Sequence, residues 1–168
     1  MQQVRWFSRP FDFQPDNGLF PSILERLSGT PARLEEKVRD VEATILQAKP
    51  SDQWSVKEET GHLADLEPLW LLRVHDILAE KTVLTAADLD NRKTHEANHN
   101  ARHSSDLLTH FRGERAKLMR QLAAATDADL EKFSRHPRLQ TPMRLIDLAY
   151  FVAEHDDHHL ARMTRLLL

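Results

Sequence analysis

Apolar residues recur at every third or fourth position in four long stretches of the chain, which is the period of an amphipathic α-helix. The four stretches cover residues 19–47, 55–78, 104–125 and 141–166. An amphipathic helix must bury its apolar face, and four such helices in one chain are typical of a helical bundle. The pattern therefore predicts an all-α fold, a four-helix bundle.

Capping residues mark where several of these helices begin. Ser55 and Glu58 have the Ser-x-x-Glu spacing of a capping box, which predicts the start of the second helix. Thr141-Pro142 places a cap residue before a proline that suits the first helical turn, so we expect the fourth helix to begin there. Residues 126–130 predict a short capped turn after the third helix.

Prolines interrupt the pattern of the first and second helices. Thr30 is a possible cap and Pro31 suits a first helical position, so we expect a kink near residues 29–31. Pro68 lies inside the second helix and is expected to kink it or to force a local adjustment. The apolar stripe after Pro31 has a 4-3-4 spacing and consists of Leu34, Val38, Val41 and Ile45.

Two segments lie outside the four helices. Residues 1–18 contain four aromatic residues among prolines, and they predict an irregular arm pinned by its aromatic side chains onto a bundle domain of residues 19–168. Residues 80–102 are polar, and the expected element there is a short helix from about residue 86 to residue 98.

Composition narrows the class of protein. The 168 residues carry a net charge of −3 with basic and acidic residues interleaved, which argues against nucleic acid as a partner. Cysteine is absent, so a disulfide framework, a cysteine zinc site and a thiol nucleophile are excluded. The sequence has no apolar segment typical of a signal peptide or of a membrane span, so we expect a cytoplasmic protein that does not enter the membrane.

The fourth helix places two of the ten histidines on its buried stripe. His155 and His159 are spaced i and i+4, which makes them neighbours on one helix face. Inward imidazoles need partners, since an unpaired buried polar group costs roughly 1–3 kcal/mol. A divalent metal is one such partner, and backbone groups or water are the other, so both interpretations stay open on spacing alone. The full stripe reads Leu145, Leu148, Val152, His155, His159, Met163 and Leu166.

A third metal ligand should come from a facing helix. His62 is the best candidate, because it lies beside inward residues of the second helix, although a half-exposed helix histidine is the simpler interpretation of it alone. His158 points away from the stripe and is expected beside the site or in solvent. Asp156 or Asp157 is a candidate to orient a ligand through its second ring nitrogen. A second set, at residues 95, 99 and 103, could form another cluster or line a pocket mouth, but it lies in a polar stretch and is expected to be solvated.

Two motifs together resemble a known family. The first motif consists of Trp54, Ser55, Glu58 and His62. The second motif, far downstream, consists of Ala153, Glu154, His155, Asp156, His159 and Leu160. In order, separation and helix position they resemble the DinB/YfiT-like superfamily. The segments at residues 111–115 and 141–143 are similar too, and the resemblance runs from about residue 19 onward, leaving the arm outside.

The resemblance implies a fold, a metal and several chemistries. Family members are up-down-down-up four-helix bundles, often homodimers, that bind one divalent metal, zinc or nickel. The ligands are one histidine of the second helix and a His-x-x-x-His pair of the fourth, which implies His62, His155 and His159 here. The superfamily includes S-transferases and isomerases that use a low-molecular-weight thiol, together with proteins assigned as metal-dependent hydrolases.

Three functional hypotheses follow. The first is a metal-dependent thiol S-transferase or hydrolase acting on a small-molecule substrate, with Asp65, Glu67 and Asp156 as candidate acid or base groups. The second is a non-catalytic metal-binding module of the stress response, in which the metal stabilises the bundle. The third is a bundle without metal whose buried histidines respond to pH.

Overall fold

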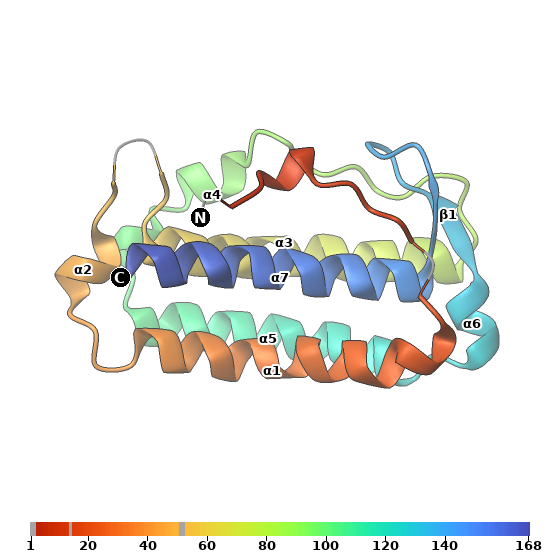
Figure 1. The fold of residues 1–168 in the computed structure, drawn as a ribbon, viewed down its shortest axis with the longest axis horizontal. Coiled ribbons are helices and arrows are strands. Elements are labelled where there is room, and N and C mark those ends of the chain that lie inside the picture. The colour runs from red at the N-terminus through yellow and green to blue at the C-terminus, as the bar shows by residue number, and fades with distance from the viewer. Residues whose placement is uncertain (1–2, 14, 51–52) are drawn as a thin grey trace.

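Four long helices lie side by side along the whole molecule (Figure 1). They are α1 (Phe20–Val38), α3 (Val56–Leu78), α5 (Ser104–Ala123) and α7 (Leu145–Leu166). The structure is a computed structural model that describes residues 3–13, 15–50 and 53–168. It confirms the predicted all-α four-helix bundle, and in these ranges the strands form one small two-stranded sheet.

The bundle has the up-down-down-up topology. In Figure 1, α1 and α7 run toward the left-hand end, whereas α3 and α5 both run toward the right. Each long helix packs against two others, in the cyclic order α1, α7, α3, α5. Because α3 and α5 are parallel neighbours, residues 79–103 must return along the full length of the bundle before α5 begins. That connection passes over the same side of the bundle as the N-terminal arm.

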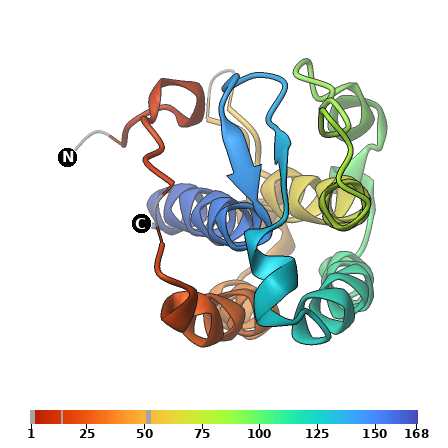
Figure 2. The ribbon, with the colours of Figure 1, turned by 90° about the vertical axis from the view of Figure 1, so that its right-hand side faces the viewer.

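Short elements close the ends and cover this side. The arm contains η1 (Trp6–Ser8) and η2 (Asn17–Leu19), and α2 (Ala43–Gln47) lies between α1 and α3. The long connection contains α4 (Arg92–Glu96) and η3 (His99–Ala101). At the other end, α6 (Asp127–Glu131) leads into the antiparallel pair β1 (Phe133–Arg135) and β2 (Pro142–Arg144), in which Ser134 pairs with Met143 (Figure 2).

The apolar core fills the space between the four helices. One cluster includes Leu27, Trp70, Leu118 and Phe151, all at most 3% exposed. A second cluster lies around Leu34, Leu63, Phe111 and Met163. Among the described residues, no helix combines the length and the apolar character that crossing a membrane requires.

The predicted capping box of Ser55 and Glu58 and the predicted capped turn at residues 126–130 are both confirmed. Ser55 Oγ accepts a hydrogen bond from the Glu58 N–H at 3.1 Å, and the Glu58 carboxylate accepts one from the Ser55 N–H at 2.9 Å. Thr126 and Asp129 form the same reciprocal pair at the start of α6. Two orphan amide groups are thereby satisfied at each helix start, which fixes where α3 and α6 begin.

The first helix is shorter than predicted. α1 ends at Val38, since the chain turns at Asp40, whose φ is +57°. Of the predicted stripe, only Leu34 is fully buried, and Ile45 is 47% exposed. Thr30 does not cap a new helix, because α1 continues through Pro31 and Thr30 Oγ1 donates to the Arg26 carbonyl within it. α3 likewise continues through Pro68.

The fourth helix begins later than predicted, and the long connection contains less helix. Residues 142–144 pair as a strand, so α7 starts at Leu145. In the connection, α4 and η3 are short because Asn91 and Asn98 adopt φ of +52° and +49° in front of them. The prediction that all three histidines of this stretch are solvated was wrong for His99, which is 2% exposed.

Candidate metal centre

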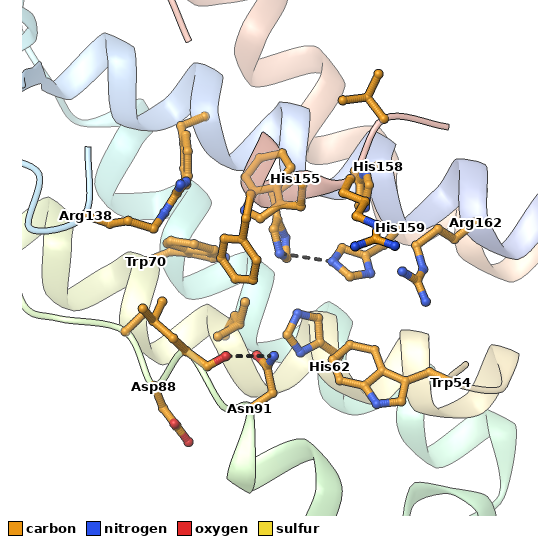
Figure 3. A pocket seen from close by; sticks show the side chains of 18 of the residues that line it. Trp54, His62, Trp70, Asp88, Asn91, Arg138, His155, His158, His159 and Arg162 are labelled. Carbon is orange, nitrogen blue, oxygen red and sulfur yellow. Dashed lines mark hydrogen bonds between the residues drawn. The ribbon is translucent and has the colours of Figure 1, made fainter. Parts of the chain in front are cut away.

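Three buried histidines meet where α3 and α7 face each other. His62 comes from the second turn of α3, and His155 and His159 come from successive turns of α7. Their exposures are 3%, 3% and 5%, and one nitrogen from each ring lies within 4.8 Å of the other two. Figure 3 shows the three rings pointing toward one another. The structure thus brings together the three residues that the sequence nominated as metal ligands.

The outer nitrogen of His159 is held by a carboxylate. His159 Nδ1 lies 2.5 Å from Glu59 Oε2, and the other oxygen of Glu59 accepts a hydrogen bond from Arg162 Nε at 2.6 Å. A carboxylate accepts only, so Nδ1 carries the proton and Nε2 keeps its lone pair. This is the outer partner that fixes the tautomer of a metal-binding histidine.

A longer chain of hydrogen bonds positions His62. Its Nδ1 lies 3.1 Å from Thr94 Oγ1, and Thr94 Oγ1 donates to Asp65 Oδ2 at 3.1 Å. The same Asp65 oxygen is 2.8 Å from His99 Nε2. With Nδ1 occupied by Thr94, Nε2 is the nitrogen of His62 that remains available to an ion.

The histidines are uncharged near neutral pH. Burial lowers the pKa of His62 and His155 well below the ordinary value, and the neighbouring imidazoles lower it further. Burial also brings the pKa of His159 to about 3. Neutral imidazoles offer the lone pairs that a metal requires.

The spacing of these nitrogens fits a divalent ion. Ligand nitrogens about 2.0–2.1 Å from a tetrahedral zinc lie about 3.3 Å apart. His155 Nε2 and His159 Nε2 are 3.1 Å apart. His155 Nδ1 is buried without a hydrogen-bond partner in the described part of the chain. Three neutral imidazoles are a donor set that suits zinc and nickel.

A cavity of about 660 Å³ lies against all three histidines. Its walls come from α3, α7, the N-terminal arm, the long connection and the loop after β1, and the lining includes three tryptophans, Trp6, Trp54 and Trp70. Trp6 of the arm meets the His155 ring edge-on at 5.0 Å, and Trp54 lies 4.6 Å from His62. The predicted arm is therefore a wall of the site, held in part by the Arg9–Glu154 ion pair.

The three candidate acid or base residues lie elsewhere. Asp65 supports His62 through Thr94, as described above. Glu67 and Asp156 both pair with Arg115, whose guanidinium lies 2.6 Å from each carboxylate. None of the three borders the cavity. Asp156 therefore does not orient a histidine ligand, and that role falls to Glu59.

Sequence reasoning missed several contributors. Glu59 lies three residues before His62 on a capped helix, and this i, i+3 spacing was a usable signal. Of the two positions expected for His158, the structure has the one beside the site: the residue is 7% exposed, and its Nδ1 accepts a hydrogen bond from Gln3 Nε2 at 3.0 Å. No periodic signal connects Trp6 or Thr94 with the site, because η1 and α4, in which they lie, have only three and five residues.

The fold and the site define a class, a four-helix bundle with a buried three-histidine group beside a cavity. Comparison with known proteins gives the family: residues 26–163 match the model of the DinB superfamily, and the chain belongs to it. Among solved structures, the chain is similar to YfiT from Bacillus subtilis, described as a probable metal-dependent hydrolase with an unusual four-helix bundle topology. The two share 20% identity over 94% of this chain and 91% of that one, with a TM-score of 0.81. No curated protein matches the sequence.

Proposed function

We propose that the protein is a metal-dependent hydrolase of a small molecule, with one zinc or nickel ion held by His62, His155 and His159. The observation that carries the proposal is the cavity of about 660 Å³ that borders all three histidines. A metal that only stabilises a fold is enclosed by four protein ligands, whereas a catalytic metal keeps a position open to substrate or water. The description of YfiT, which shares the fold, also supports a hydrolase.

The chain's own residues supply the positioning. A divalent ion bound by three neutral nitrogens supplies a water that ionises near neutral pH and a Lewis acid that polarises a substrate oxygen. Glu59 and Thr94 fix the ring orientation of two of the histidines from outside. Trp6 and Trp54 pack against the rings of His155 and His62 and give the cavity apolar walls beside them.

A panel of activated esters, amides and phosphate esters, each assayed with and without glutathione, tests the proposal. We expect hydrolysis of at least one substrate without thiol, its loss on chelation, and its return with zinc or nickel. His155→Ala should abolish this activity, while His110→Ala, which changes an exposed histidine on α5, should retain it. Activity that survives chelation would refute a metal-dependent hydrolase, and turnover only with thiol would reassign the site to thiol transfer.

A further inference from the structure

The cavity carries a charge opposite to that of the whole chain. The net charge of the sequence is −3, yet among the residues that the structure describes, the cavity lining contains five arginines and a single carboxylate, that of Asp88. Asp88 is exposed and accepts hydrogen bonds from the backbone N–H groups of Asp90 and Arg92. The arginines are Arg5, Arg73, Arg138, Arg162 and Arg165.

Two of these arginines, Arg73 and Arg138, lie near each other, and neither forms an ion pair with a carboxylate of the described residues. Arg73 is 2% exposed, and its guanidinium donates to the Thr85 carbonyl at 2.9 Å and lies 3.2 Å from His136 Nε2. In the described ranges, no carboxylate oxygen comes within 4.0 Å of Arg73 or Arg138. By contrast, Arg162 is neutralised by Glu59 at 2.6 Å.

Unused hydrogen-bond donors gather at the same end of the cavity. Arg138 Nη2 is buried and has no partner within the described residues. The indole N–H of Trp70, a residue that is 3% exposed, is likewise buried and unpaired. Both side chains line the cavity, and Figure 3 shows Arg138 beyond Trp70 as seen from the histidines. Buried donors without partners are uncommon in folded proteins, because an unpaired buried donor destabilises the fold.

The electrostatics agree with a missing anion. Burial lowers the pKa of Arg73 to about 10, because it outweighs the charge of the neighbouring Asp76, which acts in the opposite direction, and the charge of Arg138 lowers the pKa further. Burial also lowers the pKa of Arg138. A guanidinium that is deprived of water and of a counterion favours an anion, and its planar fork matches a carboxylate or a phosphate.

We propose that Arg73, Arg138 and the Trp70 indole N–H form a binding site for the carboxylate or phosphate group of an anionic small-molecule substrate. The bound anion would accept from the two donors that now lack partners. The further assignment, that the reacting group of the same molecule lies at the three histidines, rests on the proposed function. The substrate class is thus a small organic anion with apolar surface that contacts the tryptophan walls.

Calorimetric titration with two probe anions, inorganic phosphate and benzoate, tests the site at constant ionic strength set by chloride. The protein is used as purified, beside Arg138→Gln and the matched control Arg135→Gln, which removes an exposed arginine from the same hairpin. We expect at least one probe to bind, with affinity reduced tenfold or more by Arg138→Gln and changed less than twofold by Arg135→Gln. Equal affinity in all three proteins, or no binding of either probe, would overturn the proposal.

A fourth protein, His155→Ala, distinguishes anion binding at this site from anion binding at the metal. Phosphate bound at a metal would be lost in His155→Ala and retained in Arg138→Gln, and this pattern would overturn the proposal. Retention in His155→Ala with loss in Arg138→Gln is the expected pattern. Metal content, measured on the same samples, should be unchanged by Arg138→Gln. Anion binding in protein that takes up no metal would refute the hydrolase while supporting the anion site.

Discussion

Arg115→Met tests how the four helices are held together at the centre of the bundle. Arg115 extends from α5, and its side chain is 2% exposed. Its five N–H groups make five hydrogen bonds, two to Glu67 of α3, two to Asp156 of α7 and one to the Leu27 carbonyl of α1. One guanidinium therefore contacts every long helix, with no donor left over.

The loss of stability in Arg115→Met follows from the two carboxylates, of Glu67 and Asp156, that the substitution leaves buried. Methionine fills much of the same volume, but it leaves two carboxylates that are 1% and 0% exposed without a cation. Breaking a buried ion pair on one side costs about 3–5 kcal/mol. With a urea dependence of about 2 kcal/mol per molar, the unfolding midpoint should fall by about 2 M.

Urea unfolding followed by circular dichroism measures this change against a matched control. Arg112→Met makes the same substitution one turn earlier on α5, where Arg112 pairs with Glu35 at side-chain exposures of 53% and 41%. That exposed pair is worth about 0–1 kcal/mol. A triple variant, Arg115→Met with Glu67→Met and Asp156→Leu, should regain most of the lost stability because no charge stays buried. The reasoning fails if Arg115→Met costs no more than Arg112→Met.

Two other predictions concern buried histidines outside the three-histidine group. Burial beside Arg73 lowers the pKa of His136 to about 3, so the folded state binds fewer protons than the unfolded chain between pH 6.5 and 3. The free energy of unfolding should therefore fall as the pH is lowered below 6.5, by at most about 1.4 kcal/mol per pH unit. The fall should be less steep in His136→Gln, and parallel pH profiles of the wild type and this variant would contradict the prediction. Gly61→Ala should destabilise the fold by about 1–3 kcal/mol in thermal unfolding, since a Cβ there would lie 2.3 Å from the His99 ring. Gly113→Ala, in open space on α5, should instead stabilise by about 1 kcal/mol, and similar effects at both glycines would refute the packing argument.

Hydrophobic periodicity predicted the parts of the fold that depend on it. The four long helices each bury one stripe, so their number and approximate positions could be read from the sequence. The helix boundaries near Val38 and Asn91 could not be read from the sequence. They depend on positive φ angles at Asp40 and Asn91, and most other asparagines and aspartates of the chain do not adopt such angles. The β1–β2 pair has three residues in each strand, too few for a period-2 pattern to be distinguished from a loop.

The site was predictable to a similar extent. His155 and His159 lie on the buried stripe of α7, and the resemblance added His62. Sequence could not distinguish a carboxylate that pairs with Arg115 from one beside the histidines, because that difference depends on which helices are neighbours. The homodimer, the thiol cosubstrate and the cytoplasmic location stay predictions.

Metal content tests the central claim most directly. Elemental analysis of the purified protein should find about one equivalent of zinc or nickel per chain, before or after exposure to that ion. The double variant His155→Ala, His159→Ala should contain essentially none, while His110→Ala should match the wild type. Wild-type protein that takes up neither metal, or a double variant that binds as much as the wild type, would contradict the account.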